Sequence, residues 1–275
     1  MVESRNWVEM PDDIMGGMIL QRLDAVEILT SAQKVCRNWR RICKDPAMWK
    51  TIDLDHYSYA SSYTKNDFEK LCKQAVHRSC GELIDIRLKC VVTNDLLDFI
   101  SRCSSKLKSL RVLKCYNVTG NGLIHALKRL PCLETLDLFY ISIEAEHIKV
   151  IGQSCPHLKS FKMKSRFMES ADALAIANSM PALRHLQLFG RAITGDGLRA
   201  ILHGCRQLES LDLRRCSCLM LGGSLGKLCR ERIKDFKFTV RTNLFEIFDS
   251  DSDDFDEDDE FSAGFPKGVF DNYWI

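Results

Sequence analysis

The sequence lacks the patterns that mark membrane proteins and secreted proteins. No apolar run reaches the roughly 20 residues that a membrane-spanning helix needs. The first residues, "MVESRNWVEMPDD", contain no apolar segment after a basic start, so they do not predict a secretory signal. We therefore expect a chain of the nucleus or the cytoplasm, where thiols remain reduced and disulfides are rare.

Paired metal ligands and catalytic motifs are also missing. Thirteen cysteines are present, but only Cys216 and Cys218 are closely spaced, whereas a structural zinc site usually needs two such pairs. The sequence contains no H-E-x-x-H, G-x-S-x-G or phosphate-binding-loop motif, and its seven histidines are scattered. We predict no metal, no cofactor and no enzymatic activity, and we interpret the cysteines as small packing residues.

Basic residues are absent from one stretch near the end of the sequence, Asp249 to Glu260, which contains nine acidic residues. The net charge of the whole chain is +2, so the remainder carries +11 once these nine acids are set aside. High charge with low hydrophobicity predicts disorder, and we assign residues 241–275 as an acidic disordered tail. Its aromatic end, "FPKGVFDNYWI", is a candidate docking segment that would cap a repeat array.

The sequence is rich in one hexamer, apolar-x-x-apolar-x-apolar, which recurs every 24 to 26 residues. Period-2 alternation at the end of each copy predicts a strand with one buried face. A helical pattern follows, and its start is marked by "TGNG" at Thr119 and by "TGDG" at Thr194. The seven copies begin at Leu83, Leu107, Leu133, Leu158, Leu183, Leu208 and Ile233.

One strand and one helix in about 25 residues make a leucine-rich repeat unit. A single unit cannot bury its apolar face, so we predict that about six repeats stack into an α/β solenoid over residues 82–240. Cysteines recur just before the strands, as at Cys155 and Cys205, and just after them, as at Cys115. In this the repeats resemble the cysteine-containing type of leucine-rich repeat.

Residues 1–52 do not share the repeat, and their apolar spacing predicts three short helices. "MPDDIMGGMILQRL" begins with helix-start chemistry, and "DAVEILTSAQKVCRNWRRIC" predicts one amphipathic helix before a break at Pro46. A unit this small buries too little surface to be stable alone, so it should pack on the repeats or on a partner. Residues 53–81, with "KNDFEKLCKQAVHRSC", are assigned as a helical bridge.

The segment "MPDDIMGGMILQRL…VCRNWRRICKDPAMWKTIDL" resembles an F-box, and the whole chain resembles plant F-box/leucine-rich-repeat proteins related to the Skp-interacting partners. The resemblance implies a substrate-recognition adaptor of an SCF ubiquitin ligase. Its F-box would bind a Skp-type linker protein, joined in turn to a cullin and a RING subunit, and its repeats would hold the protein to be ubiquitinated. The residues assigned to linker binding are Met10, Pro11, Ile14, Ile19, Leu20, Leu23, Val35, Cys36, Trp39, Pro46 and Trp49.

The outward positions of the predicted strands indicate where a target would bind. Phe139 and Phe189 are expected on the exposed sheet face among cations, a combination suited to an acidic and partly apolar segment. Two alternatives stay open at this point: a scaffold that binds the linker without delivering a target, and a basic repeat protein associated with nucleic acid. The residues assigned to target binding are Arg111, Phe139, Lys162, Lys164, Phe189 and Arg214.

Overall fold

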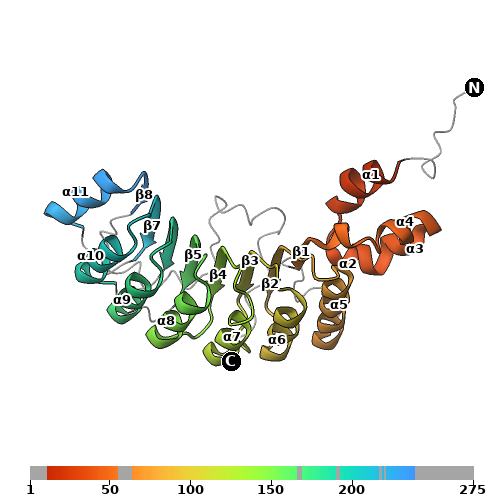
Figure 1. Cartoon of the computed structure of the whole chain (residues 1–275), viewed down its shortest axis with the longest axis horizontal. Helices are drawn as coiled ribbons and strands as arrows, with labels where there is room; N and C mark the ends of the chain where they lie inside the picture. Colours follow the sequence, from red (N-terminus) through yellow and green to blue (C-terminus); the bar gives the residue numbers. More distant parts are fainter. Residues whose placement is uncertain are drawn as a thin grey trace, which may run out of the picture. The chain divides into compact units, whose positions relative to one another are not determined.

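The structure is a computed structural model that describes residues 11–54, 64–165, 169–189, 193–216, 219 and 221–238. The chain divides into two compact units, Met1–Thr239 and Val240–Ile275. The predicted acidic tail, its candidate docking segment and Met10 lie outside the described residues. All the described helices and strands belong to the first unit (Figure 1).

One layer of this unit is a parallel sheet whose eight described strands follow one another in chain order. Parallel neighbours need a connection that crosses back along the sheet, and in this chain each such connection carries a helix (Figure 1). The strands are β1 Thr51–Leu54, β2 Asp85–Lys89, β3 Ser109–Leu113, β4 Thr135–Phe139, β5 Ser160–Lys164, β6 His185–Phe189, β7 Ser210–Arg215 and β8 Asp235–Lys237.

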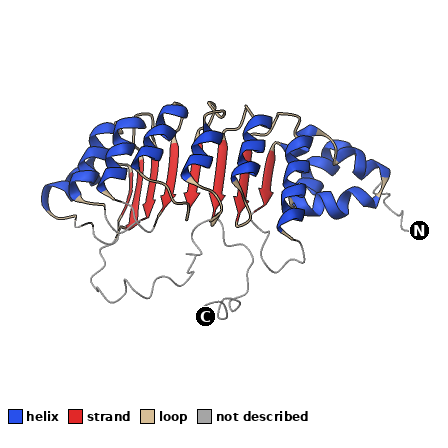
Figure 2. Cartoon of the chain, turned by 90° about the horizontal axis from the view of Figure 1, so that it is seen from below, coloured by secondary structure: helices blue, strands red, loops and turns tan. Residues whose placement is uncertain are grey.

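The second layer consists of the connecting helices, which lie along one face of the sheet (Figure 2). Helix α5 is the helix that the sequence predicts within the bridge. No helix in the described part of the chain is long and apolar enough to span a bilayer. The helices are α5 Lys65–Arg78, α6 Asn94–Cys103, α7 Gly120–Leu127, α8 Ala145–Ser154, α9 Ser170–Ser179, α10 Gly195–Gly204 and α11 Gly223–Arg232.

The seven predicted hexamers coincide with strands β2 to β8. The first copy begins at Leu83, two residues before β2, and its apolar residues Leu83, Ile86 and Leu88 are fully buried. The register places Ile86 beside Leu110 of β3, so equivalent side chains stack from one repeat to the next. Each buried aliphatic side chain contributes roughly 1.5–3 kcal/mol to stability. The predicted leucine-rich-repeat solenoid is confirmed.

The predicted helix starts are also observed. The hydroxyl of Thr119 accepts a hydrogen bond from the backbone N–H of Gly122 at 3.1 Å, and that of Thr194 accepts one from Gly197 at 3.3 Å. Threonine caps a helix in this way because its side chain satisfies one of the backbone donors that the first turn leaves unpaired. The repeated "TG" pair therefore marks the beginning of α7 and of α10.

Strand β1 is a feature that the sequence analysis missed. It occupies Thr51–Leu54, across the boundary drawn between the F-box at 1–52 and the bridge at 53–81, and it pairs in parallel with β2. Just before it, the carbonyl of Lys50 accepts hydrogen bonds from the backbone N–H groups of Ile84 and Asp85. The chain therefore passes from the predicted F-box straight into the first strand of the sheet.

The predicted F-box is a group of short helical elements. The run from α1 to η3 matches the first predicted helix, and elements η2 and η4 contain wide π turns. The elements are α1 Asp12–Ile14, η2 Met15–Ile19, η3 Leu20–Arg22, α2 Ala25–Glu27, η4 Ile28–Ala32, α3 Gln33–Val35, α4 Arg37–Ile42 and η5 Pro46–Trp49.

The prediction of one amphipathic helix through "DAVEILTSAQKVCRNWRRIC" was wrong. Cys36 is extended, with φ −155° and ψ 173°, and it separates α3 from α4. Its sulfur accepts a hydrogen bond from the backbone N–H of Trp39 at 3.4 Å, so it caps the start of α4. The break places Val35 at the end of one helix with 62% of its surface exposed, instead of in a continuous buried stripe.

Candidate protein-interaction surfaces

Two residues assigned to linker binding lie inside the predicted F-box. Leu20 is fully buried, and Trp49 is only 1% exposed. The indole Nε1 of Trp49 donates a hydrogen bond to the carbonyl of Cys43 at 2.9 Å. Buried indoles usually find such a partner, and this one holds η5 against the end of α4. Leu20 and Trp49 therefore support the fold and present no surface to a partner.

The other described residues of the set reach the surface to different degrees. Pro11 is exposed, Ile14 is 38% exposed and Val35 is 62% exposed. Six large hydrophobic residues in the described part of the chain are exposed, and Ile14 and Val35 are the two that lie in the F-box segment. The half-buried members of the set are Ile19, Leu23, Cys36, Trp39 and Pro46.

A surface ion pair joins the first helical run to α4. Arg41 Nη2 lies 2.5 Å from both carboxylate oxygens of Asp12 and donates to Asn38 Oδ1 at 2.7 Å. The hydrogen bond from Arg41 lowers the pKa of Asp12 and raises that of Arg41. Because both side chains are largely exposed, solvent screens the pair, and it contributes little to stability.

The two glycines of the first helical run have different surroundings. Gly16 is buried, and a Cβ atom placed on it would lie 3.1 Å from Ile42 Cγ2 and 3.5 Å from Met48 Sδ. A Cβ placed on Gly17 would meet nothing within 4 Å. Gly16 therefore permits close packing of this run on α4 and η5. Gly17 lowers helix stability and permits no such packing contact.

Arg78, in the last turn of α5, ties the predicted F-box to the repeats. Its Nη1 donates to the carbonyl of Cys43 at 3.1 Å, and its Nη2 donates to Gln33 Oε1 at 2.7 Å. Its guanidinium carbon lies 5.4 Å from the centre of the Trp49 ring. Burial lowers the pKa of Arg78. The sequence analysis missed this residue because no local pattern separates it from the other arginines of the chain.

The sheet face opposite the helices carries a middle row of polar side chains in register. Arg87 Nη1 lies 3.0 Å from Asp53 Oδ2, and Arg111 lies 3.5 Å from Asp137 and 3.9 Å from Asp85. Arg111, which the sequence assigned to target binding, is therefore compensated by carboxylates of its own sheet. The row is Asp53, Arg87, Arg111, Asp137, Lys162, Gln187, Asp212 and Lys237.

Asp137 is the most deeply buried acid of this row, with 2% of its surface exposed. Burial raises its pKa, and the positive charges of Lys162, Arg111 and Arg87 partly oppose that change. Within the described structure its Oδ1 accepts no hydrogen bond. Although Asp137 belongs to a row on the sheet face opposite the helices, it is therefore shielded from solvent.

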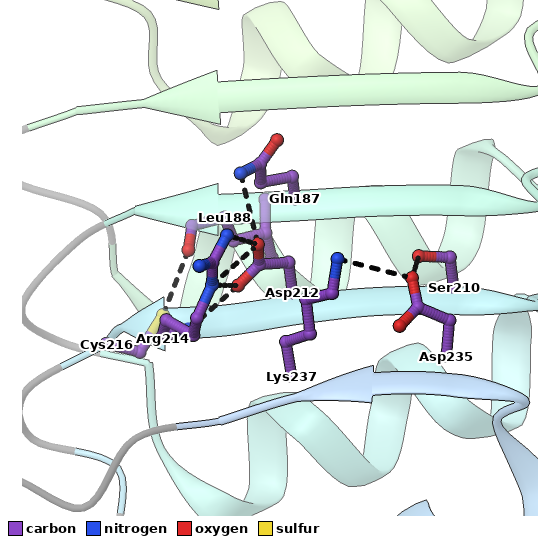
Figure 3. A network of polar contacts seen from close by, with 8 residues as sticks. All are labelled: Gln187, Leu188, Ser210, Asp212, Arg214, Cys216, Asp235 and Lys237. Atoms are coloured by element: carbon purple, nitrogen blue, oxygen red, sulfur yellow. Dashed lines mark hydrogen bonds and ion pairs between the residues drawn. The ribbon is translucent and has the colours of Figure 1, made fainter. Parts of the chain in front are cut away.

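Arg214, also assigned to target binding, is held by Asp212 of the same strand (Figure 3). Its Nη2 lies 2.9 Å from Asp212 Oδ2, and its Nε lies 3.1 Å from each carboxylate oxygen. Gln187 donates to the same carboxylate at 3.2 Å, while Lys237 pairs with Asp235 at 3.6 Å (Figure 3). A target acid would therefore compete with Asp212 for the Arg214 guanidinium.

The expectation that Phe139 and Phe189 are both exposed was wrong for Phe189, which is 8% exposed, while Phe139 is half-buried. Their ring centres lie 6.1 Å apart although β5 separates their strands, so the two rings lean toward each other across it. Lys164 stands in register between them, and its Nζ lies 4.5 Å from the centre of the Tyr140 ring. The structure thus brings Phe139, Lys164 and Phe189 together, as the sequence predicted.

The described cysteines are all free thiols. Burial raises the pKa of Cys72, Cys115 and Cys155 to about 12, which makes them poor nucleophiles at neutral pH. The thiol of Cys115 donates to the carbonyl of Leu113 at 3.1 Å. In the part of the chain that the structure covers, no three His, Cys, Asp or Glu side chains are grouped as metal ligands. These thiols act in packing.

Comparison with known proteins identifies the two parts of the chain. Residues 7–55 match the family described as F-box-like. The chain is 46% identical to F-box protein SKIP19 of Arabidopsis thaliana over 234 aligned residues. The alignment covers 84% of this chain and 76% of that protein. This chain belongs to the plant F-box/leucine-rich-repeat family. Residues 11–50 are therefore called the F-box from here on.

Other members of the family show the same relation. Putative F-box/LRR-repeat protein 23 of Arabidopsis thaliana is 46% identical over 240 residues, 85% of this chain and 53% of that protein, so the chain spans about half of that relative's length. Putative F-box/LRR-repeat protein 22 is 45% identical over 238 residues, 84% of this chain and 76% of the relative. A chain of the yeast Rad7 and Elc1 complex aligns over 85% of this chain and 84% of its own, with 10% identity and a TM-score of 0.45, a likeness too distant to support a functional argument.

Proposed function

We propose that this F-box protein is the substrate-recognition adaptor of an SCF ubiquitin ligase and acts in the nucleus or the cytoplasm. In this role the F-box binds a Skp-type linker protein, through which a cullin and a RING subunit are recruited. The repeats bind the protein to be ubiquitinated. The adaptor forms no bond itself, because its contribution is to hold the target near the transferring enzyme and so raise its effective concentration.

The observation that carries the proposal is the exposure of two apolar side chains in the F-box. Val35, at 62% exposure, and Ile14, at 38%, stand among helices whose remaining apolar side chains are mostly buried. Covering such side chains contributes roughly 1.5–3 kcal/mol for each one fully buried. A small helical unit that keeps them exposed is suited to be completed by a partner protein.

The direct junction between the F-box and the sheet supports the adaptor role. Lys50 alone separates Trp49 of η5 from β1, and Arg78 hydrogen-bonds to the F-box from α5. A target held on the repeats would therefore keep a fixed distance from the linker protein. Fixed geometry raises the effective concentration of the target more than a flexible tether does.

Affinity purification of the full-length chain from plant cells under proteasome inhibition tests the proposal. We expect a Skp-type linker and a cullin to co-purify with the wild type, and proteins bound to the repeats to carry ubiquitin chains. Val35→Asp should lose the linker and the ubiquitin chains but keep the bound proteins. Capture of the linker with no ubiquitinated protein would favour a scaffold without target delivery, and absence of the linker would refute the F-box role.

A further inference from the structure

The sheet face opposite the helices is chemically graded along its strands. Its first row, at the start of the strands, consists of Asp85, Ser109, Thr135, Ser160, His185, Ser210 and Asp235. Its last row, at the end of the strands, consists of Lys89, Leu113, Phe139, Lys164 and Phe189, and on β7 Arg214 lies on the same face as Asp212. Among the described strand residues, acids occur in the first and middle rows, and the last row has cations and apolar side chains instead.

The backbone beyond this last row is strained in three successive repeats. Cys90, Lys114 and Tyr140 have positive φ values of 67°, 53° and 59°, although none of them is glycine. The backbone N–H of each donates a hydrogen bond to the carbonyl oxygen of the last residue of the next strand, with N···O distances of 2.9 to 3.0 Å. Left-handed conformations of non-glycine residues cost energy and cluster at functional surfaces. The strain is repeated at the end of the sheet that carries the cations.

The apolar side chains of the last row form a small aromatic centre. Phe139 and Phe189 pack with their ring centres 6.1 Å apart, and Lys164 lies between their strands. Tyr140 adds a third ring beneath the Lys164 ammonium at 4.5 Å. Cations held beside aromatic rings at a partly buried position are well placed to receive a carboxylate next to an apolar side chain.

We propose that the last row is the target-docking strip and that its occupant is an extended, acidic peptide segment with aromatic or aliphatic residues between its acids. The inference rests on the proposed function, and it deepens it by naming the chemistry of the target. Charge complementarity selects this occupant, because the last row combines cations with apolar and aromatic side chains. The peptide would cross the strands at their ends, from β2 to β7.

The spacing of the strip sets the expected pattern of the peptide. Neighbouring strands lie about 4.8 Å apart and an extended chain advances about 3.3 Å per residue. Lys89 on β2 is three strands from Lys164 on β5, or about 14 Å, which corresponds to roughly four peptide residues. Arg214 on β7 is two strands further, or about 10 Å and roughly three residues. The pattern is therefore an acid, a second acid about four residues later and a third about three residues after that.

Fluorescence anisotropy with the purified full-length chain tests this proposal. The probe is a labelled peptide of about eight residues with aspartates at that spacing and two phenylalanines between them. We expect saturable binding that weakens as salt rises, because exposed charges are screened. Lys164→Glu should weaken binding at least about tenfold, and the milder Lys164→Gln should weaken it less. Lys149→Glu on α8, on the helical layer, is the matched control and should leave binding unchanged.

Two control peptides decide the chemistry of the occupant. Replacing the aspartates by lysines should abolish binding, and replacing the phenylalanines by serines should weaken it at least about fivefold. Equal binding of the serine peptide, or displacement of the probe by a single-stranded DNA oligonucleotide at the same concentration, would overturn the proposal in favour of a general polyanion surface. No binding by the wild type would also overturn it. The assay contains no linker or cullin, so either outcome leaves the F-box proposal to its own test.

Discussion

Replacing Arg78 by alanine should weaken the attachment of the F-box to the repeats. The side chain donates two hydrogen bonds, to Cys43 O and to Gln33 Oε1, and lies over the Trp49 ring. Hydrogen bonds from a charged group contribute about 1.5–3 kcal/mol each, and a partly desolvated cation–π contact about 1 kcal/mol. Truncation also removes the cost of burying the guanidinium, and Trp49 Nε1 still satisfies Cys43 O. We therefore expect a net loss of about 2–3 kcal/mol.

Urea unfolding followed by two signals tests this expectation. No tryptophan occurs between residues 53 and 240, so in a Trp7→Phe, Trp274→Phe background the fluorescence comes from Trp39 and Trp49 and reports the F-box. Circular dichroism at far-ultraviolet wavelengths reports mainly the repeats. In the wild type the two transitions should coincide, because the junction couples the F-box to the repeats. In Arg78→Ala the fluorescence transition should move to lower urea and separate from the circular dichroism transition.

The matched control is Arg199→Ala. Arg199 lies on α10, and its ion pair with Asp196 is exposed, so its removal should change stability by no more than about 0.5 kcal/mol. A loss below 0.5 kcal/mol in Arg78→Ala, or an equal loss in both variants, would refute the assignment of Arg78 as the junction residue.

Three further expectations follow from the same contacts. Gly17→Ala should raise the free energy of unfolding by about 0.5–1 kcal/mol, because alanine favours a helix over glycine. Gly16→Ala should lower it, because the new methyl group meets Ile42 Cγ2. Urea unfolding measures both changes, and equal effects would contradict the packing described. Burial raises the pKa of Asp137 in the folded state above its unfolded value near 3.9, so the folded state keeps the proton to higher pH. The free energy of unfolding of the wild type should therefore fall, relative to that of Asp137→Asn, as pH rises from about 4 through the raised pKa. A difference between the two that stays constant from pH 4 to 7 would contradict this. Iodoacetamide at neutral pH should label the exposed Cys80 and Cys132 in the native chain and leave Cys72, Cys115 and Cys155 unmodified, as read by peptide mass mapping; rapid native labelling of these three would show that they are not buried.

Much of the fold follows from local sequence signals. The hexamers predict strands because side chains alternate along a strand, so a buried face leaves a period of two residues. The helix starts at Thr119 and Thr194 follow from side-chain capping, which is also local. Strand β1 could not be predicted this way, because Thr51–Leu54 is short and depends on pairing with β2.

The sequence predicted which residues lie together on the candidate surfaces better than it predicted how exposed their side chains are. Sequence spacing identified Phe139, Lys164 and Phe189 as neighbours on one face, which repeat register determines. It could not show that Phe189 is buried, because the tilt of two rings across an intervening strand depends on side-chain packing. Likewise, the apolar spacing around Cys36 predicts that the helix continues through it. The extended backbone of Cys36 ends α3 instead. Ion pairs such as that between Arg214 and Asp212 depend on side-chain rotamers, which the sequence pattern does not specify.

The central claim is that the F-box binds a Skp-type linker protein through its exposed apolar side chains. Isothermal titration of a purified plant Skp-type linker into the full-length chain measures this directly, with Val35→Asp compared with Leu174→Asp. Leu174 lies on α9 with 48% exposure, so it controls for placing a charge at an exposed apolar position outside the F-box. Burial of Val35 contributes about 1.5–3 kcal/mol, so we predict that Val35→Asp weakens binding at least about tenfold. We predict unchanged binding for Leu174→Asp; equal affinities of wild type and Val35→Asp, or no binding by the wild type, would contradict the account.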